Sequence, residues 1–157
     1  MTGSAIPNVL ALFTAPATGQ PMESHTDVDV VAGLGIAGDR YATRRGHWSD
    51  PRWKDQELTL VGAELLAELG LATAALRRNI VTRGIDLLDL IGLEFAIGGA
   101  RLAGRRQCSP CAYIERLTRP GLFAELGGRG GLRAAIIEGG RISVGDEVRI
   151  VGLAAHE

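Results

Sequence analysis

Lysine is nearly absent from this chain of 157 residues, since Lys54 stands against sixteen arginines. Pyridoxal phosphate is anchored as a lysine Schiff base, so pyridoxal chemistry within the chain would depend on Lys54 alone and is not expected. Cysteine is equally scarce, and two residues cannot build a disulfide framework, which makes a cytoplasmic location the expectation. No uninterrupted apolar run approaches the roughly 18 residues of a membrane helix.

The balance of charge and polarity excludes further classes. A formal net charge of −1 gives no electrostatic basis for general nucleic-acid binding. Apolar residues make up 46% and charged residues 22%, which predicts a single globular domain over residues 1–157 with its core at about 8–151. No basic residue precedes the first apolar run at 9–13, so we expect no secretory signal. The arginine excess fits either GC-rich coding or recognition of an oxyanion by guanidinium groups.

Glycine is abundant, and its 22 residues fall between short apolar runs. This spacing predicts tight turns between short strands. Strands are expected at 8–13, 28–31, 57–61, 78–82, 94–97, 100–103 and 132–137, followed by a closing hairpin of 142–144 and 148–150 around Gly145-Asp146. Residues 14–24 are expected to form a loop, 63–69 a helix and 86–90 a short helical turn.

Helices are too sparse among these strands for a doubly wound sheet. We therefore predict a mainly β protein, a closed or nearly closed β-barrel with a few short peripheral helices.

The sharpest local motif is Cys108-Ser109-Pro110-Cys111. Three interpretations compete: two buried small apolar residues, a thioredoxin-type dithiol pair, and a single functional thiolate at Cys111. If a helix begins at Pro110, its dipole and the nearby arginines favour the Cys111 thiolate. A structural zinc site is set aside, because the motif supplies two of four ligands and no histidine stands at a ligand spacing.

Polar segments elsewhere suggest an anion site. The run from Arg77 to Asp86 contains Arg78 and Asn79, which fit an arginine clamp for phosphate or simply a strand with basic ends. The Gly38-Asp39-Arg40 turn allows Asp39 to orient Arg40 toward a ligand, or is an ordinary solvated turn. The glycines around Arg129 fit either an anion-binding nest or a flexible loop.

The order of these motifs resembles the MOSC domain, the molybdenum cofactor sulfurase C-terminal domain. The resemblance covers about 8–150 and is carried by the following series: Gly38-Asp39-Arg40, Arg78-Asn79-Ile80-Val81, Gly84-Ile85-Asp86, the cysteine motif, Gly130-Gly131-Leu132-Arg133 and Gly139-Gly140-Arg141 through Gly145-Asp146.

This resemblance implies a β-rich barrel that binds molybdenum cofactor. It places the family's cysteine, a sulfur carrier or molybdenum ligand, at Cys111 and leaves the role of Cys108 open. The cofactor-binding residues that it implies are Arg40, Arg78, Asn79, Asp39, Thr82 and Arg133. A soft thiolate suits molybdenum with its dithiolene sulfurs, and arginine suits the pterin phosphate.

The sequence departs from larger relatives, because it carries neither their pyridoxal-dependent desulfurase domain, nor their additional N-terminal barrel, nor a cysteine cluster for iron–sulfur electron delivery. We therefore expect a cysteine desulfurase or an electron-transfer protein as partner, and a molybdenum or metal–sulfur enzyme as acceptor. Alternatives are a small molybdenum-dependent reductase of N-hydroxylated substrates, a non-catalytic cofactor-binding module, and a dithiol oxidoreductase.

Overall fold

The computed structural model describes residues 6–17, 20–39, 57–108, 118, 120–126 and 129–154. The strands in these ranges are β1 (Asn8–Thr14), β2 (Glu23–His25), β3 (Asp27–Val31), β4 (Gly35–Ile36), β5 (Leu58–Gly62), β6 (Ile80–Arg83), β7 (Leu93–Ile97), β8 (Ala100–Gln107), β9 (Leu132–Glu138), β10 (Gly140–Ser143) and β11 (Val148–Leu153). The helices are α1 (Ala63–Glu68), the 3-10 turn η1 (Leu87–Leu90) and α3 (Leu122–Leu126).

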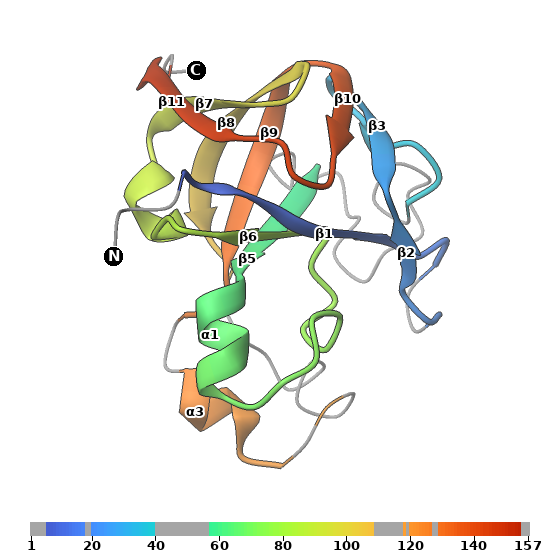
Figure 1. Cartoon of the computed structure of the whole chain (residues 1–157), viewed down its shortest axis with the longest axis vertical. Coiled ribbons are helices and arrows are strands. Elements are labelled where there is room, and N and C mark those ends of the chain that lie inside the picture. The colour runs from blue at the N-terminus through green and yellow to red at the C-terminus, as the bar shows by residue number, and fades with distance from the viewer. Residues whose placement is uncertain are drawn as a thin grey trace.

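Among the described residues, eight strands form one sheet in the order β11-β7-β8-β9-β5-β6-β1-β2, and β10-β3-β4 form a smaller one. The large sheet curls into a half-barrel, in which a bridge joins Asn8 at the start of β1 to Glu147, the residue before β11 (Figure 1). The β5–β6 pair is parallel, and α1 lies in the connection between its two strands. The prediction of a mainly β fold with few short helices is confirmed.

Apolar clusters cover both faces of the central strands. Leu12, Leu60 and Ile80 pack inside the curled sheet, whereas Val61 and Val81 point to the opposite face. On that opposite face they meet Leu66 of α1 and Leu122 and Leu126 of α3, which lie together at one end of the sheet (Figure 1). Burial on both faces explains why β5 is a nearly continuous apolar run instead of an alternating one.

Two expectations from the sequence are wrong. The strands on either side of Gly145-Asp146 do not pair with each other, because β10 joins β3 and β11 joins β7. The start of β1 takes the hydrogen bonds of this turn: Val9 N donates to Asp146 O over 2.9 Å, and Gly145 N donates to Val9 O over 2.8 Å. The segment expected to be a loop, 14–24, also includes the first two residues of β2, of which Ser24 pairs with Phe13.

No helix in the described ranges is long and apolar enough to span a membrane.

Gly104, in the bent part of β8, permits a close backbone approach. A Cβ atom there would collide with the carbonyl oxygen of Leu90, whereas a Cβ at Gly152 in β11 would meet nothing within 4 Å. We expect Gly104→Ala to lower the free energy of unfolding by about 1–3 kcal/mol, the usual cost of overpacking a fitted site. Urea unfolding monitored by circular dichroism measures this loss. Gly152→Ala is the matched control, and equal losses in both variants would contradict the packing argument.

Candidate functional site

Asn79 lies immediately before β6 and joins three strands through its side chain. Its Oδ1 accepts from the backbone N of Thr59 at 3.1 Å and from Thr59 Oγ1 at 3.2 Å. Its Nδ2 donates to Phe13 O at 3.1 Å. Asn79 and Thr59 are both fully buried, so these bonds link β1, β5 and the start of β6 away from water.

Strand register extends this polar feature into a row. Thr59 of β5 pairs with Arg133 of β9, and Arg133 pairs with Arg106 of β8. Directly paired residues of antiparallel strands project from the same face of a sheet. Thr59, Arg133 and Arg106 therefore share the face of the sheet that also carries α1 and α3.

Arg78 and Arg133 are buried guanidinium groups, with exposed fractions of 4% and 6%. Arg78 Nε donates to Gly130 O at 2.8 Å, which ties Arg78 to the segment that leads into β9. Within the described part of the chain, Nη2 of Arg78 and Nη1 of Arg133 are buried without a hydrogen-bond partner. A buried charge with open donors is costly unless an anion or a polar partner satisfies them, so these atoms are suited to hold an oxyanion.

The other predicted site residues are placed as follows. Asp39 is fully buried, and its Oδ1 accepts from Ala15 N at 3.0 Å, directly after β1. Thr82 pairs with Val9 of the core inside the curled sheet, and its buried hydroxyl has no partner among the described residues. Arg40 and Cys111 lie outside the described residues.

Cys108 is fully buried directly after β8, and its backbone N donates to Gly131 O at 2.7 Å. Gly131 is two residues from Arg133, and its neighbour Gly130 accepts the bond from Arg78. The chain therefore leaves the sheet beside both buried arginines, three residues before the predicted functional Cys111.

Sequence reasoning missed Thr59, which supplies the partner of Asn79. Its only sequence signal is a single polar residue inside the apolar run 58–61. That signal becomes specific only when strand register places Thr59 between Asn79 and Arg133.

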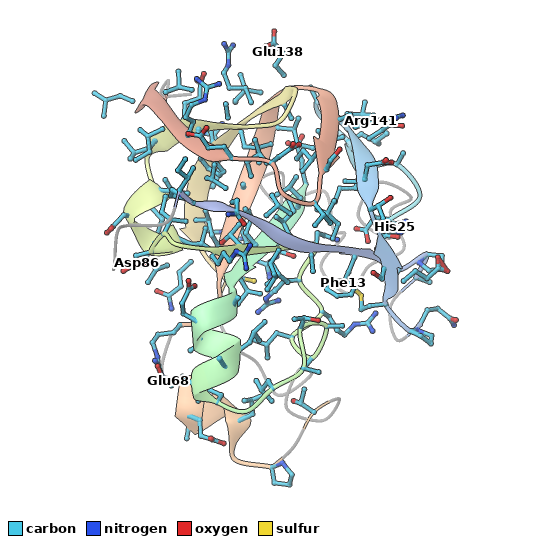
Figure 2. All side chains as sticks on the ribbon, in the orientation of Figure 1. Phe13, His25, Glu68, Asp86, Glu138 and Arg141 are labelled. Carbon is cyan, nitrogen blue, oxygen red and sulfur yellow. The ribbon has the colours of Figure 1, made fainter. Side chains whose placement is uncertain are left out.

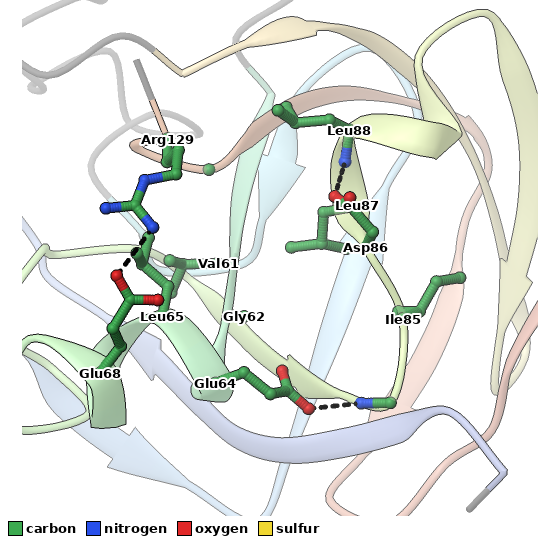
Figure 3. Close-up of a pocket in the computed structure, with 12 residues that line it drawn as sticks. Val61, Gly62, Glu64, Leu65, Glu68, Ile85, Asp86, Leu87, Leu88 and Arg129 are labelled. Atoms are coloured by element: carbon green, nitrogen blue, oxygen red, sulfur yellow. Dashed lines mark hydrogen bonds and ion pairs between the residues drawn. The ribbon is translucent and has the colours of Figure 1, made fainter. Parts of the chain in front are cut away.

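Sequence reasoning also missed a cavity of about 480 Å³ between α1, the turn after β6, η1 and the residues before β9 (Figure 3). Its apolar lining residues are Val61, Leu65, Ile85, Leu87 and Leu88. Its charged lining residues are Glu64, Glu68, Asp86 and Arg129. Gly131 also lines it, so the cavity adjoins the segment that holds Arg78.

The sequence model of the MOSC domain family matches residues 53–149, so the chain belongs to the MOSC domain family. No functionally curated protein sequence matches the chain.

Several solved structures are similar in fold, among them those of one YuaD and two YiiM proteins. The YuaD protein from Bacillus subtilis superposes with a TM-score of 0.77 at 18% identity, over 98% of this chain and 100% of that one. YiiM from Geobacillus stearothermophilus has a TM-score of 0.69 at 13% identity, over 92% of this chain and 75% of that one. YiiM from Escherichia coli has a TM-score of 0.65 at 19% identity, over 95% of this chain and 72% of that one. At these identities the likeness establishes the fold.

We expect Asn79→Ala to lower the free energy of unfolding by about 2–4 kcal/mol, because it leaves a buried backbone N–H of Thr59 and the carbonyl of Phe13 without their side-chain partner. Chemical denaturation measures the change. Asn8→Ala, which removes exposed hydrogen bonds to Ile6 and Arg83, is the control and should cost much less. If Asn79→Ala loses no more stability than the control, the hydrogen bonds of the Asn79 side chain are dispensable.

Proposed function

We propose that this protein binds molybdenum cofactor, or carries sulfur as a Cys111 persulfide for delivery to a metal–sulfur centre, in the cytoplasm. The observation that carries the proposal is the pair of buried guanidinium groups, Arg78 and Arg133, with open donors beside the segment that leads to Cys111. Membership of the MOSC family supports the same chemistry.

Arg78 and Arg133 would hold the phosphate of the pterin. Arg78 is oriented by its bond to Gly130 O, which leaves Nη2 open for an oxyanion. Arg133 is fixed by its position on β9 between β5 and β8, with Nη1 open. Two donors held in fixed positions bind an oxyanion without the entropy cost of ordering long side chains. The bound cofactor would supply a molybdenum centre for two-electron chemistry.

Asn79 mainly holds the neighbouring strands in place and offers little direct contact to a ligand. Its Oδ1 already accepts two hydrogen bonds and its Nδ2 donates one, so a single amide hydrogen remains for a ligand. These hydrogen bonds of Asn79 fix the start of β6, directly after Arg78, and so help to fix the direction of the Arg78 guanidinium.

Sulfur carriage needs only a thiolate and a donor. The Cys111 thiolate would attack the terminal sulfur of a persulfide on a cysteine desulfurase; a new S–S bond forms on Cys111, the donor's S–S bond breaks, and the donor leaves as a thiolate. No external oxidant or reductant is consumed. Complete burial of Cys108 supports a single working thiol over dithiol exchange, in which the first cysteine must be reachable.

The test is to purify the chain from a host that makes molybdenum cofactor, then to measure bound molybdenum by mass spectrometry and pterin by fluorescence. A second arm incubates the protein with a cysteine desulfurase and measures persulfide. We expect retention of cofactor, persulfide, or both, and their loss in Cys111→Ser but not in Cys108→Ala. Absence of molybdenum, pterin and persulfide would overturn the proposal.

We expect Arg78→Gln and Arg133→Gln each to weaken cofactor retention roughly tenfold or more, because each removes a charge-assisted hydrogen bond. Arg149→Gln, on the exposed part of β11, is the matched control and should retain the cofactor. Arg78→Lys should restore part of the binding if charge matters. Circular dichroism verifies that each variant is folded, and equal retention in all variants would contradict the anion site.

Turnover distinguishes the reductase alternative. Reduction of an N-hydroxylated substrate by the cofactor-loaded protein with an artificial electron donor would assign catalysis to this chain. If the protein binds the cofactor or forms the persulfide but shows no turnover, its role is that of a carrier.

A further inference from the structure

The cavity beside α1 combines apolar walls with an excess of negative charge. Among the described residues, three carboxylates and one guanidinium line it, together with five large aliphatic side chains (Figure 3). Its volume of about 480 Å³ is within the size range of small-molecule sites.

Arg129 neutralises only part of this charge, because its single positive charge faces three carboxylates and is paired with one of them, Glu68. Nη1 pairs with Glu68 at 2.9 Å, Nε donates to Leu126 O at 3.1 Å, and Nη2 donates to Glu125 O at 3.0 Å. Arg129 thus fastens the last carbonyls of α3 to α1. The negative charges of Glu64 and Asp86 remain.

Those two carboxylates are held in place by the same turn. Glu64 Oε2 accepts from Gly84 N at 2.7 Å, and Asp86 Oδ1 accepts from Leu88 N at 3.1 Å. The second oxygen of each has no partner among the described residues. Figure 3 shows Glu64 on α1 and Asp86 on the chain above it, with Ile85 to one side. Each carboxylate is therefore pre-positioned and keeps one oxygen for a ligand.

We propose that this cavity binds an organic cation: a small molecule with an aromatic or aliphatic body and a protonated amine or amidine. The apolar walls take the body, and the open oxygens of Glu64 and Asp86 take the N–H groups. A bare metal ion does not fit, because no group of three metal-ligating side chains exists among the described residues. An anion is repelled by the net charge.

The cavity and the arginine site adjoin the same segment before β9. Gly131 lines the cavity, and Gly130 O accepts from Arg78. The cation site stands without the cofactor proposal, since neither Arg78 nor Arg133 lines the cavity.

The experiment titrates the full-length, nitrogen-15-labelled protein with three ring compounds of matched size: benzamidine, neutral benzamide and anionic benzoate. We expect saturable millimolar binding of benzamidine, with amide shifts centred on Gly84 and Leu88. Benzamide should bind several-fold more weakly and benzoate should not bind. The protein carries no cofactor in this arm, so the result is independent of the molybdenum test.

Isosteric variants test the charges. Glu64→Gln and Asp86→Asn keep the acceptor for Gly84 N and Leu88 N, and each should weaken benzamidine about two- to fivefold, as for solvent-accessible ion pairs. The double variant should bind benzamidine no more tightly than benzamide. Asp89→Asn, an exposed acid on η1 outside the cavity, is the near control. Glu138→Gln is the far control, at the end of the molecule away from Glu68 (Figure 2).

Equal binding of benzamidine and benzamide, shifts centred away from the turn 84–88, or equal weakening by the control variants would each overturn the proposal. Absence of saturable benzamidine binding would also overturn it.

Discussion

The side-chain amide of Asn79 holds together the strands on which both candidate sites depend. β5 and β6 run parallel, and the chain reaches β6 through α1 and the following residues, so no tight turn fixes their relative position. Asn79 accepts a hydrogen bond from Thr59 N and donates one to Phe13 O, and these bonds supply that fixation inside the protein, where water does not compete. Arg78 precedes this junction, and the turn with Asp86 follows β6.

Two oppositely charged environments adjoin the residues before β9. In one, Arg78 and Arg133 are buried with open donors. In the other, Glu64 and Asp86 border an aliphatic cavity with open acceptors. The arginines are buried and preorganised, which favours tight retention of an anion. The acids are solvent-accessible, which favours weak, reversible binding of a cation. This contrast suits an anionic group retained at the arginines beside a cationic ligand that exchanges at the cavity.

Local sequence patterns predicted most strands, because alternation and glycine-rich turns depend on neighbouring residues. They failed at Gly145-Asp146, where the turn forms but its hydrogen bonds go to the start of β1, more than 130 residues earlier in the chain. They also missed β2, whose polar residues Glu23 and Ser24 become a strand only by pairing with β1. Pairing between distant segments is a property of the folded chain, so local composition does not report it.

The sequence alone determined a β-rich protein of the MOSC type and identified Arg78, Asn79 and Arg133 as unusual, because residue type and motif order are written in it. Tertiary structure decided their orientations: Asn79 bonds inward to Thr59, while both arginines keep open donors. It also created the cavity beside α1, whose acids come from α1 and from a turn about twenty residues later. The physical reason is that burial and register, which set what a side chain faces, exist only once distant strands have paired.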